Sequence, residues 1–291
     1  MVVRAYGSGV TAAMALAGLE PRDVDAGGVR VRYHAGGDGD AVVLVHGLGG
    51  AASNWVELVP DLVSRHRVLA VDLPGHGGSA APRGGSGVSD FADAVAAVVE
   101  AEAAAPALVV GHSFGGHTAL RLAERRPELV RALLLVAPAG IGTTTRLVQL
   151  AVAAAGLARP ARFVAPFRTR WADRYWYRRL LFRPWFVADA QAVSPRATVG
   201  FLEAAPLHLD TRTAGRAMVA DDPRQHLERV ACPTLVLWGA RDAQLPLDDA
   251  FEYARRLHAP LRVVADCGHL VLGERPQACL DALEDLVALS H

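Results

Sequence analysis

The chain has 291 residues, 52% of them hydrophobic, which is enough for one large domain or two small ones with a substantial core. Its 30 basic residues balance its 30 acidic residues, so no overall charge attracts nucleic acid, and we expect no nucleic-acid partner. Every basic residue in that count is Arg and none is Lys, which excludes Schiff-base chemistry and a P-loop lysine.

The N-terminal residues give a weak indication of localisation. Arg4 precedes an apolar stretch over residues 9–19 that looks like a secretory signal, but the segment carries little charge. We interpret residues 1–26 as an N-terminal extension with a short amphipathic helix, and secretion is the less favoured alternative. The 3 cysteines form no CxxC pair and no His lies at zinc-finger spacing, so we expect no structural metal and a reducing, cytoplasmic setting.

Short β-branched runs alternate with Ala- and Leu-rich segments along the chain. This alternation is typical of a mostly parallel α/β sheet flanked by helices. It predicts strands at residues 29–33, 41–45, 68–71, 108–110, 133–136, 234–238 and 261–264. It predicts helices at residues 54–64, 88–103, 115–125, 247–257 and 276–289.

Residues 141–222 interrupt this alternation, because they contain no clear strand and are too long for a plain connection. We predict a helical lid here, inserted between two core segments, 27–140 and 223–291. Arg and aromatic residues are interleaved between residues 146 and 196. Solvated Arg with packed aromatic rings is the plainest interpretation. The segment could also form a roof over an acyl chain, contact a lipid surface weakly or bind a substrate carboxylate.

The sharpest motif lies at residues 111–115, where Gly-His-Ser-Phe-Gly stands between a predicted strand and a predicted helix. This pattern is a G-x-S-x-G nucleophile elbow, whose tight turn exposes the hydroxyl of Ser113 above the sheet edge. Gly111 and Gly115 shape the turn, because a Cβ at either position would clash. We therefore predict that Ser113 is a nucleophile.

A serine hydroxyl is a weak nucleophile and needs a histidine base that a carboxylate orients. Asp242 follows predicted strand 234–238, and His269 follows predicted strand 261–264. Both residues thus lie at carboxyl ends of strands, where sites gather in open α/β sheets. The predicted triad is Ser113, Asp242 and His269.

Other residues compete for these two roles. Asp266 lies close to the predicted base, and Asp210 and Asp221 lie near the end of the predicted lid. A capping or turn role is the plainer interpretation of all three. His46 and His112 stand inside motifs, where we expect them to hold loops.

Residues 46–50, His-Gly-Leu-Gly-Gly, follow a predicted strand and suit an oxyanion hole. Gly47 and Gly49 let the backbone approach a reacting group, and the N–H groups of Leu48 and Phe114 would donate to the oxyanion. A glycine-rich turn without a ligand is the alternative. Neither G-x-G-x-x-G nor GK[ST] occurs, so the loop is not a phosphate-binding fingerprint.

Five motifs in this order resemble those of the α/β-hydrolase superfamily. They lie at residues 42–50, 72–79, 111–115, 239–242 and 268–269, the last with Glu274 and Pro276 behind it. The resemblance covers about residues 27–140 and 223–289. It implies an eight-stranded, mostly parallel sheet with a lid after the sixth strand, and structural roles for Asp72 and His76.

The resemblance also narrows the chemistry. Haloalkane dehalogenases and epoxide hydrolases use an Asp at the elbow, so Ser113 argues against both. Meta-cleavage-product hydrolases are similar at Asn54-Trp55 and residues 138–142, but they typically carry Asn where His112 stands. We expect a cofactor-free hydrolase of small-molecule esters with apolar acyl groups. C–C bond hydrolysis and a ligand-binding receptor or regulator stay open as alternatives, and so does the oligomeric state.

Overall fold

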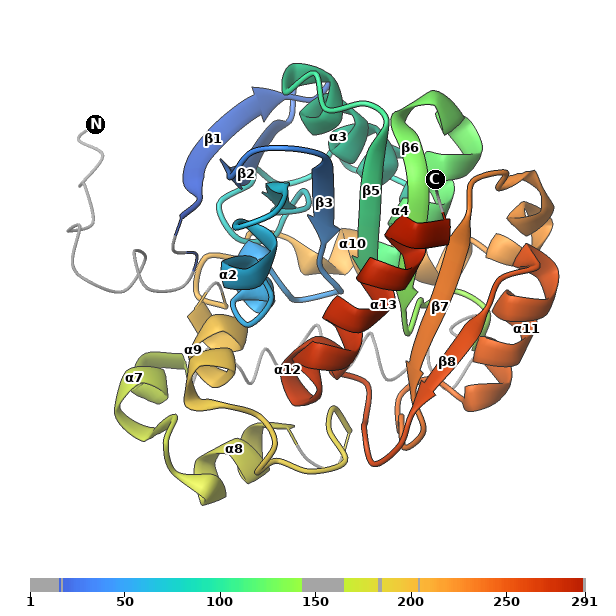
Figure 1. The fold of residues 1–291 in the computed structure, drawn as a ribbon. Helices are drawn as coiled ribbons and strands as arrows, with labels where there is room; N and C mark the ends of the chain where they lie inside the picture. The colour runs from blue at the N-terminus through green and yellow to red at the C-terminus, as the bar shows by residue number, and fades with distance from the viewer. Residues whose placement is uncertain (1–15, 17, 143–164, 183–184, 204, 290–291) are drawn as a thin grey trace, which may run out of the picture.

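The structure is a computed structural model that describes residue 16 and residues 18–142, 165–182, 185–203 and 205–289. Within these residues, eight strands form one sheet in the order β1-β2-β4-β3-β5-β6-β7-β8 (Figure 1). The strands are β1 (Glu20–Asp25), β2 (Arg30–Gly36), β3 (Ala41–Val45), β4 (Arg67–Val71), β5 (Ala107–His112), β6 (Val130–Val136), β7 (Thr234–Gly239) and β8 (Leu261–Val264). β2 pairs antiparallel with β1 and β4, and every other neighbouring pair is parallel, which confirms the predicted sheet.

All seven strands predicted from the sequence are present, and β3 and β8 have the predicted bounds. β1 is not among the predicted strands, and it lies inside residues 1–26, the segment interpreted as an extension. Its sequence, Glu-Pro-Arg-Asp-Val-Asp, lacks apolar alternation because the strand is almost entirely exposed. The sheet therefore begins at Glu20, and residues 1–15 and 17 of the predicted extension lie outside the described residues.

Helices cover both faces of the sheet. One face packs against α3 (Val88–Ala101), α4 (Phe114–Arg125), α10 (Thr211–Ala220) and α11 (Leu247–Leu257). The other packs against η1 (Ala52–Trp55), α2 (Val59–Leu62), α12 (Val271–Glu274) and α13 (Pro276–Leu289), and Figure 1 shows α2 and α13 in front of the strands. Val43 faces the first layer while Val42 and Leu44 face the second, so β3 is buried on both sides.

The helices agree with the predicted ranges within two residues, except at 54–64. There the chain forms two short helices, η1 and α2, instead of one. Pro60 stands in the first turn of α2, where its missing N–H needs no partner, whereas it would interrupt a helix running on from residue 54.

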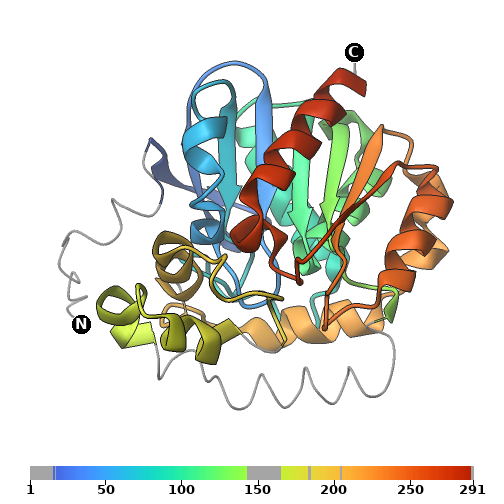
Figure 2. The same cartoon turned by 60° about the horizontal axis from the view of Figure 1, so that its bottom comes forward.

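The segment predicted as a lid, residues 141–222, is helical over much of the part that the structure describes. Before α10 it contains η4 (Ala165–Phe167), α7 (Arg168–Trp171), α8 (Tyr175–Phe182) and α9 (Pro195–Glu203), whereas residues 143–164, 183–184 and 204 lie outside the described residues. Ser53 Oγ donates to Gly200 O at 2.7 Å, and Leu270 N–H donates to Phe186 O at 3.0 Å. Because Ser53 and Leu270 follow β3 and β8, these helices lie over the carboxyl ends of the strands (Figure 2).

Glu102, the C-cap residue of α3, ties the antiparallel edge of the sheet together. Its buried carboxylate accepts hydrogen bonds from Arg22 of β1 and Tyr33 of β2, each at 2.7 Å, and from Arg67 of β4. Burial raises the pKa of Glu102, but the hydrogen bonds from Tyr33, Arg22 and Arg67 lower it by more. The pKa of Glu102 therefore lies below its ordinary value. Strand β1 has no apolar face to bury, so this polar cluster helps to hold it on the sheet.

Replacing this carboxylate should weaken the fold. We expect Glu102→Gln to lower the free energy of unfolding by about 1–3 kcal/mol, because a neutral amide with one acceptor oxygen replaces a carboxylate that accepts from the buried Tyr33 hydroxyl and two Arg side chains. Since the folded pKa of Glu102 lies below the unfolded one, its contribution is complete above the unfolded pKa and disappears as the pH falls through the folded pKa. Urea unfolding of both proteins from neutral to acidic pH measures the difference.

The exposed Glu100, which pairs with Arg126, supplies the matched control Glu100→Gln. A loss of equal size in this control, or a difference that does not change with pH, would contradict the role assigned to Glu102.

Candidate active site

Ser113 occupies a sharp turn between β5 and α4. Its backbone φ of 54° and ψ of −118° lie outside the regions that L-residues usually adopt. A Cβ on Gly111 would approach Gly115 O to 2.5 Å, and one on Gly115 would approach Val45 O to 2.1 Å. Backbone segments therefore pack directly on each other here, and the close packing holds Ser113 in its strained conformation. The strand-turn-helix predicted for residues 111–115 is present.

Asp242 and His269 meet although they follow different strands. His269 Nδ1 donates to Asp242 Oδ2 at 2.7 Å, and His269 is only 3% exposed. Asp242 Oδ1 accepts from the N–H groups of Gln244 at 2.8 Å and Leu245 at 3.0 Å. Burial raises the pKa of Asp242, but the charge and hydrogen bond of His269 and the two backbone donors lower it to below its ordinary value. Because Nδ1 carries the donated proton, Nε2 is the ring nitrogen that can accept a proton from another group.

The three rival carboxylates have other partners. Asp266 forms an exposed ion pair with Arg241 at 2.7 Å. Asp210 caps α10, and Asp221 pairs with Arg121 at 2.6 Å. Among the described residues, the carboxylate bonded to His269 is that of Asp242.

His112 links the elbow to the loop that carries His269. Its Nε2 donates to the backbone oxygen of His269 at 3.0 Å, and the two ring centroids lie 4.9 Å apart. Burial lowers the pKa of His112 to about 3, so the ring is neutral at physiological pH. Because His112 directly precedes Ser113 in the chain, this bond ties the turn that carries the predicted nucleophile to the loop that carries the predicted base.

The loop at residues 46–50 approaches Ser113 closely, since a Cβ on Gly47 would lie 3.1 Å from Ser113 Cβ. His46 Nδ1 donates to Gly47 O at 2.7 Å, and His46 Nε2 accepts from Leu73 N–H at 3.0 Å. The carbonyl of Gly47 and the N–H of Leu48 belong to one planar peptide and point in opposite directions. By holding the carbonyl, His46 therefore fixes the direction of the Leu48 N–H.

His208 holds the same loop from the segment predicted as a lid. Its Nε2 donates to Gly49 O at 2.9 Å, and its Nδ1 accepts from Gly77 N–H at 3.1 Å. His208 stands in no motif of the sequence. Nothing local marks this residue, because Gly49 and Gly77 lie more than 100 positions earlier in the chain.

Asp72 and His76 belong to the loop after β4. Asp72 Oδ1 accepts from Ala52 N–H at 2.7 Å, and Oδ2 accepts from Gly78 N–H at 2.8 Å. The His76 ring lies 5.1 Å from the His46 ring. Both residues thus support the neighbouring loops, as the resemblance implies.

Glu274 fastens the His269 loop to the segment predicted as a lid. Its buried carboxylate accepts from the N–H groups of Gly268 at 2.8 Å, Asp189 at 2.7 Å and Ala188 at 3.2 Å. Gly268 directly precedes His269, so one carboxylate sets the position of both segments. In the sequence, Glu274 stands out only as an acidic residue at the end of the short apolar run Val-Leu-Gly, and all four of these residues are buried.

No group of three or more His, Cys, Asp or Glu side chains within the described ranges has the geometry of a metal site. The loops at the carboxyl ends of β3, β5, β7 and β8 instead carry the Ser113 hydroxyl, the His269 imidazole bonded to the Asp242 carboxylate, and backbone N–H groups. Phe114 is the first residue of α4, so its N–H has no acceptor within the helix. Such a set can perform nucleophilic acyl transfer.

Comparison with known proteins gives consistent matches. The model of the family described as "Alpha/beta hydrolase family" matches residues 42–282. The chain is 34% identical over 255 residues to the pimeloyl-[acyl-carrier protein] methyl ester esterase of Aromatoleum aromaticum, covering 84% of this chain and 97% of that protein. A solved structure of 2-hydroxy-6-oxo-6-phenylhexa-2,4-dienoate hydrolase from Rhodococcus sp. strain RHA1 is similar with a TM-score of 0.74 and 26% identity, covering 93% of this chain and 99% of that one.

A third similarity extends over only part of a longer protein. The chain is 30% identical over 275 residues, 88% of its length, to the dihydrolipoyllysine-residue acetyltransferase component of the acetoin cleaving system of Cupriavidus necator. It spans 65% of the length of that relative.

Loss of the Glu274 carboxylate should loosen both segments that it joins. We expect Glu274→Gln to lower the free energy of unfolding by about 1–3 kcal/mol, because an amide has one acceptor oxygen for the three N–H donors that the buried carboxylate now accepts from. Hydrogen exchange followed by mass spectrometry should show faster exchange in peptides covering residues 185–190 and 266–270. The exposed Glu284 on α13 supplies the control Glu284→Gln, and unchanged exchange in Glu274→Gln would contradict the assignment.

Proposed function

The chain belongs to the alpha/beta hydrolase family, and on this basis we propose that it is a serine hydrolase that cleaves carboxylic esters of apolar acyl groups. The observation that carries the proposal is the 2.7 Å hydrogen bond between His269 and Asp242, next to the strained turn at Ser113. A buried, ionised carboxylate that holds an imidazole in one tautomer is the arrangement that activates a serine hydroxyl.

The reaction starts when Ser113 Oγ attacks the ester carbonyl carbon and His269 Nε2 takes the hydroxyl proton. Asp242 stabilises the imidazolium that forms. The tetrahedral intermediate then expels the alcohol, which receives its proton from His269, and the acyl group stays on Ser113. Water attacks this acyl-enzyme with His269 as base, which releases the acid and restores the hydroxyl.

The negative charge of the tetrahedral intermediate develops on the former carbonyl oxygen. In the proposed mechanism, the backbone N–H groups of Phe114 and Leu48 donate to this oxyanion. The N-terminal end of α4 adds a favourable dipole at the same place. His46 and His208 act on this step indirectly, because they hold the carbonyl groups of Gly47 and Gly49.

Two comparisons bear on the bond that is cleaved. The relative from Aromatoleum aromaticum is a methyl ester esterase and is covered almost end to end, which favours an ester. The similar structure from Rhodococcus is a dienoate hydrolase, which keeps C–C bond hydrolysis as the second candidate. Ester hydrolysis ranks first because His112 stands where meta-cleavage-product hydrolases typically carry Asn.

The direct test is hydrolysis of a p-nitrophenyl ester series from acetyl to palmitoyl by purified protein. We expect turnover in the wild type and a loss of at least about 10³-fold in kcat for Ser113→Ala, because the acyl-enzyme can no longer form. The exposed Ser64 supplies the control Ser64→Ala. Near-normal turnover by Ser113→Ala would refute the mechanism, whereas cleavage of a vinylogous diketone acid without ester turnover would favour C–C hydrolysis.

Two substitutions of His208 separate its two hydrogen bonds. In His208→Gln, the amide nitrogen can replace Nε2 as donor to Gly49 O, whereas in His208→Asn the amide oxygen can replace only Nδ1 as acceptor for Gly77 N–H. We expect His208→Asn to lose about tenfold or more in kcat with little change in KM, because oxyanion stabilisation acts on the transition state. His208→Gln should retain most of the kcat.

The exposed His258, which has a left-handed φ of 50° that Asn tolerates, supplies the control His258→Asn. Equal losses in the two His208 variants, or an effect on KM alone, would show that His208 does not position the oxyanion loop.

A further inference from the structure

Helix α8 has apolar residues on both its inner and its outer face. On the inner face, Tyr177 and Phe182 are buried against neighbouring helices and the His269 loop. On the outer face, Trp176 is 53% exposed and Leu180 is 67% exposed. A surface helix of a globular protein ordinarily presents polar residues to solvent, so the outer face needs an explanation.

The exposed apolar residues continue from α8 onto the chain on either side of it. We call the following set the α7–α8 surface: Phe167, Tyr175, Trp176, Leu180, Trp185 and Phe186, with the exposed Arg170, Arg174 and Arg179. It contains six of the eleven exposed large hydrophobic residues found in the described part of the chain. Residues gathered in this way mark a contact surface rather than the ordinary scatter of exposed side chains.

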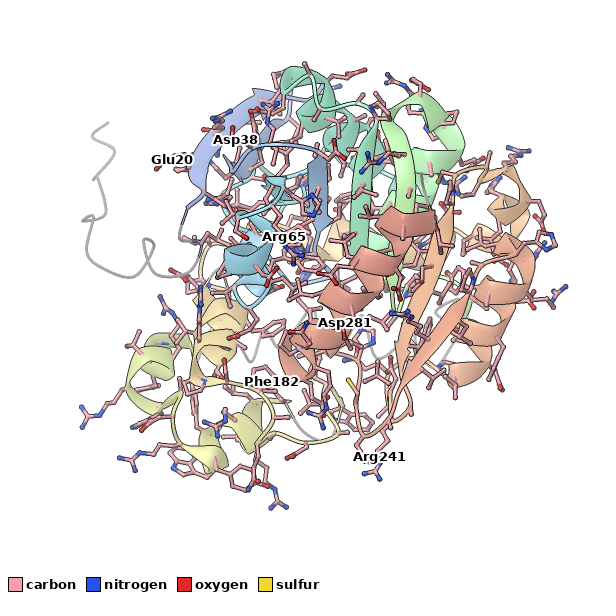
Figure 3. The ribbon with its side chains drawn as sticks, in the orientation of Figure 1. Glu20, Asp38, Arg65, Phe182, Arg241 and Asp281 are labelled. Atoms are coloured by element: carbon pink, nitrogen blue, oxygen red, sulfur yellow. The ribbon has the colours of Figure 1, made fainter. Side chains whose placement is uncertain are left out.

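The charge of this surface also differs from that of the rest of the molecule. Many exposed Arg residues elsewhere pair with carboxylates, as Arg126 does with Glu100 and Glu128. Of the three Arg residues of the α7–α8 surface, Arg174 forms an ion pair within the described part of the chain, with Asp173 at 3.7 Å. Side chains tipped with nitrogen project outward around α7 and α8 in Figure 3. The surface is therefore positive although the whole chain has a formal net charge of +0.

We propose that the α7–α8 surface docks on an anionic phospholipid membrane. Trp and Tyr side chains favour the boundary between headgroups and acyl chains, because the apolar part of the ring can contact the acyl chains while the N–H or O–H group contacts water. Arg binds lipid phosphate with paired hydrogen bonds. No helix among the described residues is long and apolar enough to cross a membrane, so the contact is with the lipid surface.

The charge distribution argues against a second copy of the chain as the partner. In a two-fold symmetric dimer the same patch meets itself, so the uncompensated Arg residues of one copy would face those of the other. An anionic lipid surface instead offers phosphate groups to the same residues. An anionic membrane therefore matches both the apolar and the positive part of the α7–α8 surface.

The position of the surface connects docking to the site. Phe186, 41% exposed, accepts a hydrogen bond from the N–H of Leu270, the residue after His269. A membrane in contact with the α7–α8 surface would thus lie close to the His269 loop, where an apolar ester dissolved in the bilayer could enter. This last step rests on the proposed function, whereas docking itself does not.

Flotation of the full chain with vesicles tests the docking without any substrate. The vesicles contain phosphatidylcholine alone or with phosphatidylglycerol, and binding is measured at low and high salt. We expect binding to the anionic vesicles, weakened by salt. Replacing Arg170 or Arg179 by Gln should lower the affinity about fivefold each, which is the effect of one basic residue near an anionic surface.

The apolar part is tested with Trp176→Ser and, as a second variant, Leu180→Ser, both at exposed positions. Each should lower vesicle binding, and Leu180→Ser, at a side chain that is 67% exposed, should leave the melting temperature unchanged. Phe251→Ser and Arg255→Gln on α11 are matched controls, because Phe251 is 55% exposed and Arg255 is an exposed Arg. These controls should bind like the wild type.

Several outcomes would overturn the proposal. They are no binding to either vesicle type, equal binding to both, or equal losses in the α11 controls. Self-association without vesicles that Trp176→Ser abolishes would assign the surface to a second copy. Because ester turnover is measured separately, a failure of docking and a failure of the proposed function can be told apart.

Discussion

The hydrogen bond between His269 and Asp242 is the interaction around which the site is arranged. It joins residues 27 positions apart, and it requires a charged carboxylate to remain ionised while almost wholly buried. Two backbone N–H donors and the imidazole offset the loss of hydration, which is why the pKa of Asp242 lies below its ordinary value. The bond therefore depends on exact placement of both loops. Glu274 and His112 supply that placement for the His269 loop, through Gly268 N–H and His269 O.

Buried histidines carry out much of the positioning around Ser113. Burial lowers the pKa of His112 and His76 to about 3 and that of His46 well below its ordinary value. A ring that stays neutral keeps one donor and one acceptor, so it can hold a carbonyl on one side and an N–H on the other. His46 does this between Gly47 O and Leu73 N–H. The loops are thus held by groups whose charge does not change over the physiological pH range.

Much of the fold and of the candidate site could be predicted from the sequence, because the signals are local. A buried parallel strand is a short apolar run, and the elbow is a strand, a tight turn and a helix within a few residues. The parallel topology then places the residues after β5, β7 and β8 at one edge of the sheet. Ser113, Asp242 and His269 could be named for this reason, and the structure places them at that edge.

The sequence by itself determined the sheet, its seven apolar strands and the order of the motifs, since each depends on residues close together in the chain. Only the tertiary structure decided that β1 joins the sheet and that His208 and Glu274 hold the loops of the site. In each case a polar group finds its partner across the fold. Hydrogen bonds between distant segments leave no periodic pattern in a sequence. They are seen only when the folded chain brings the two segments together.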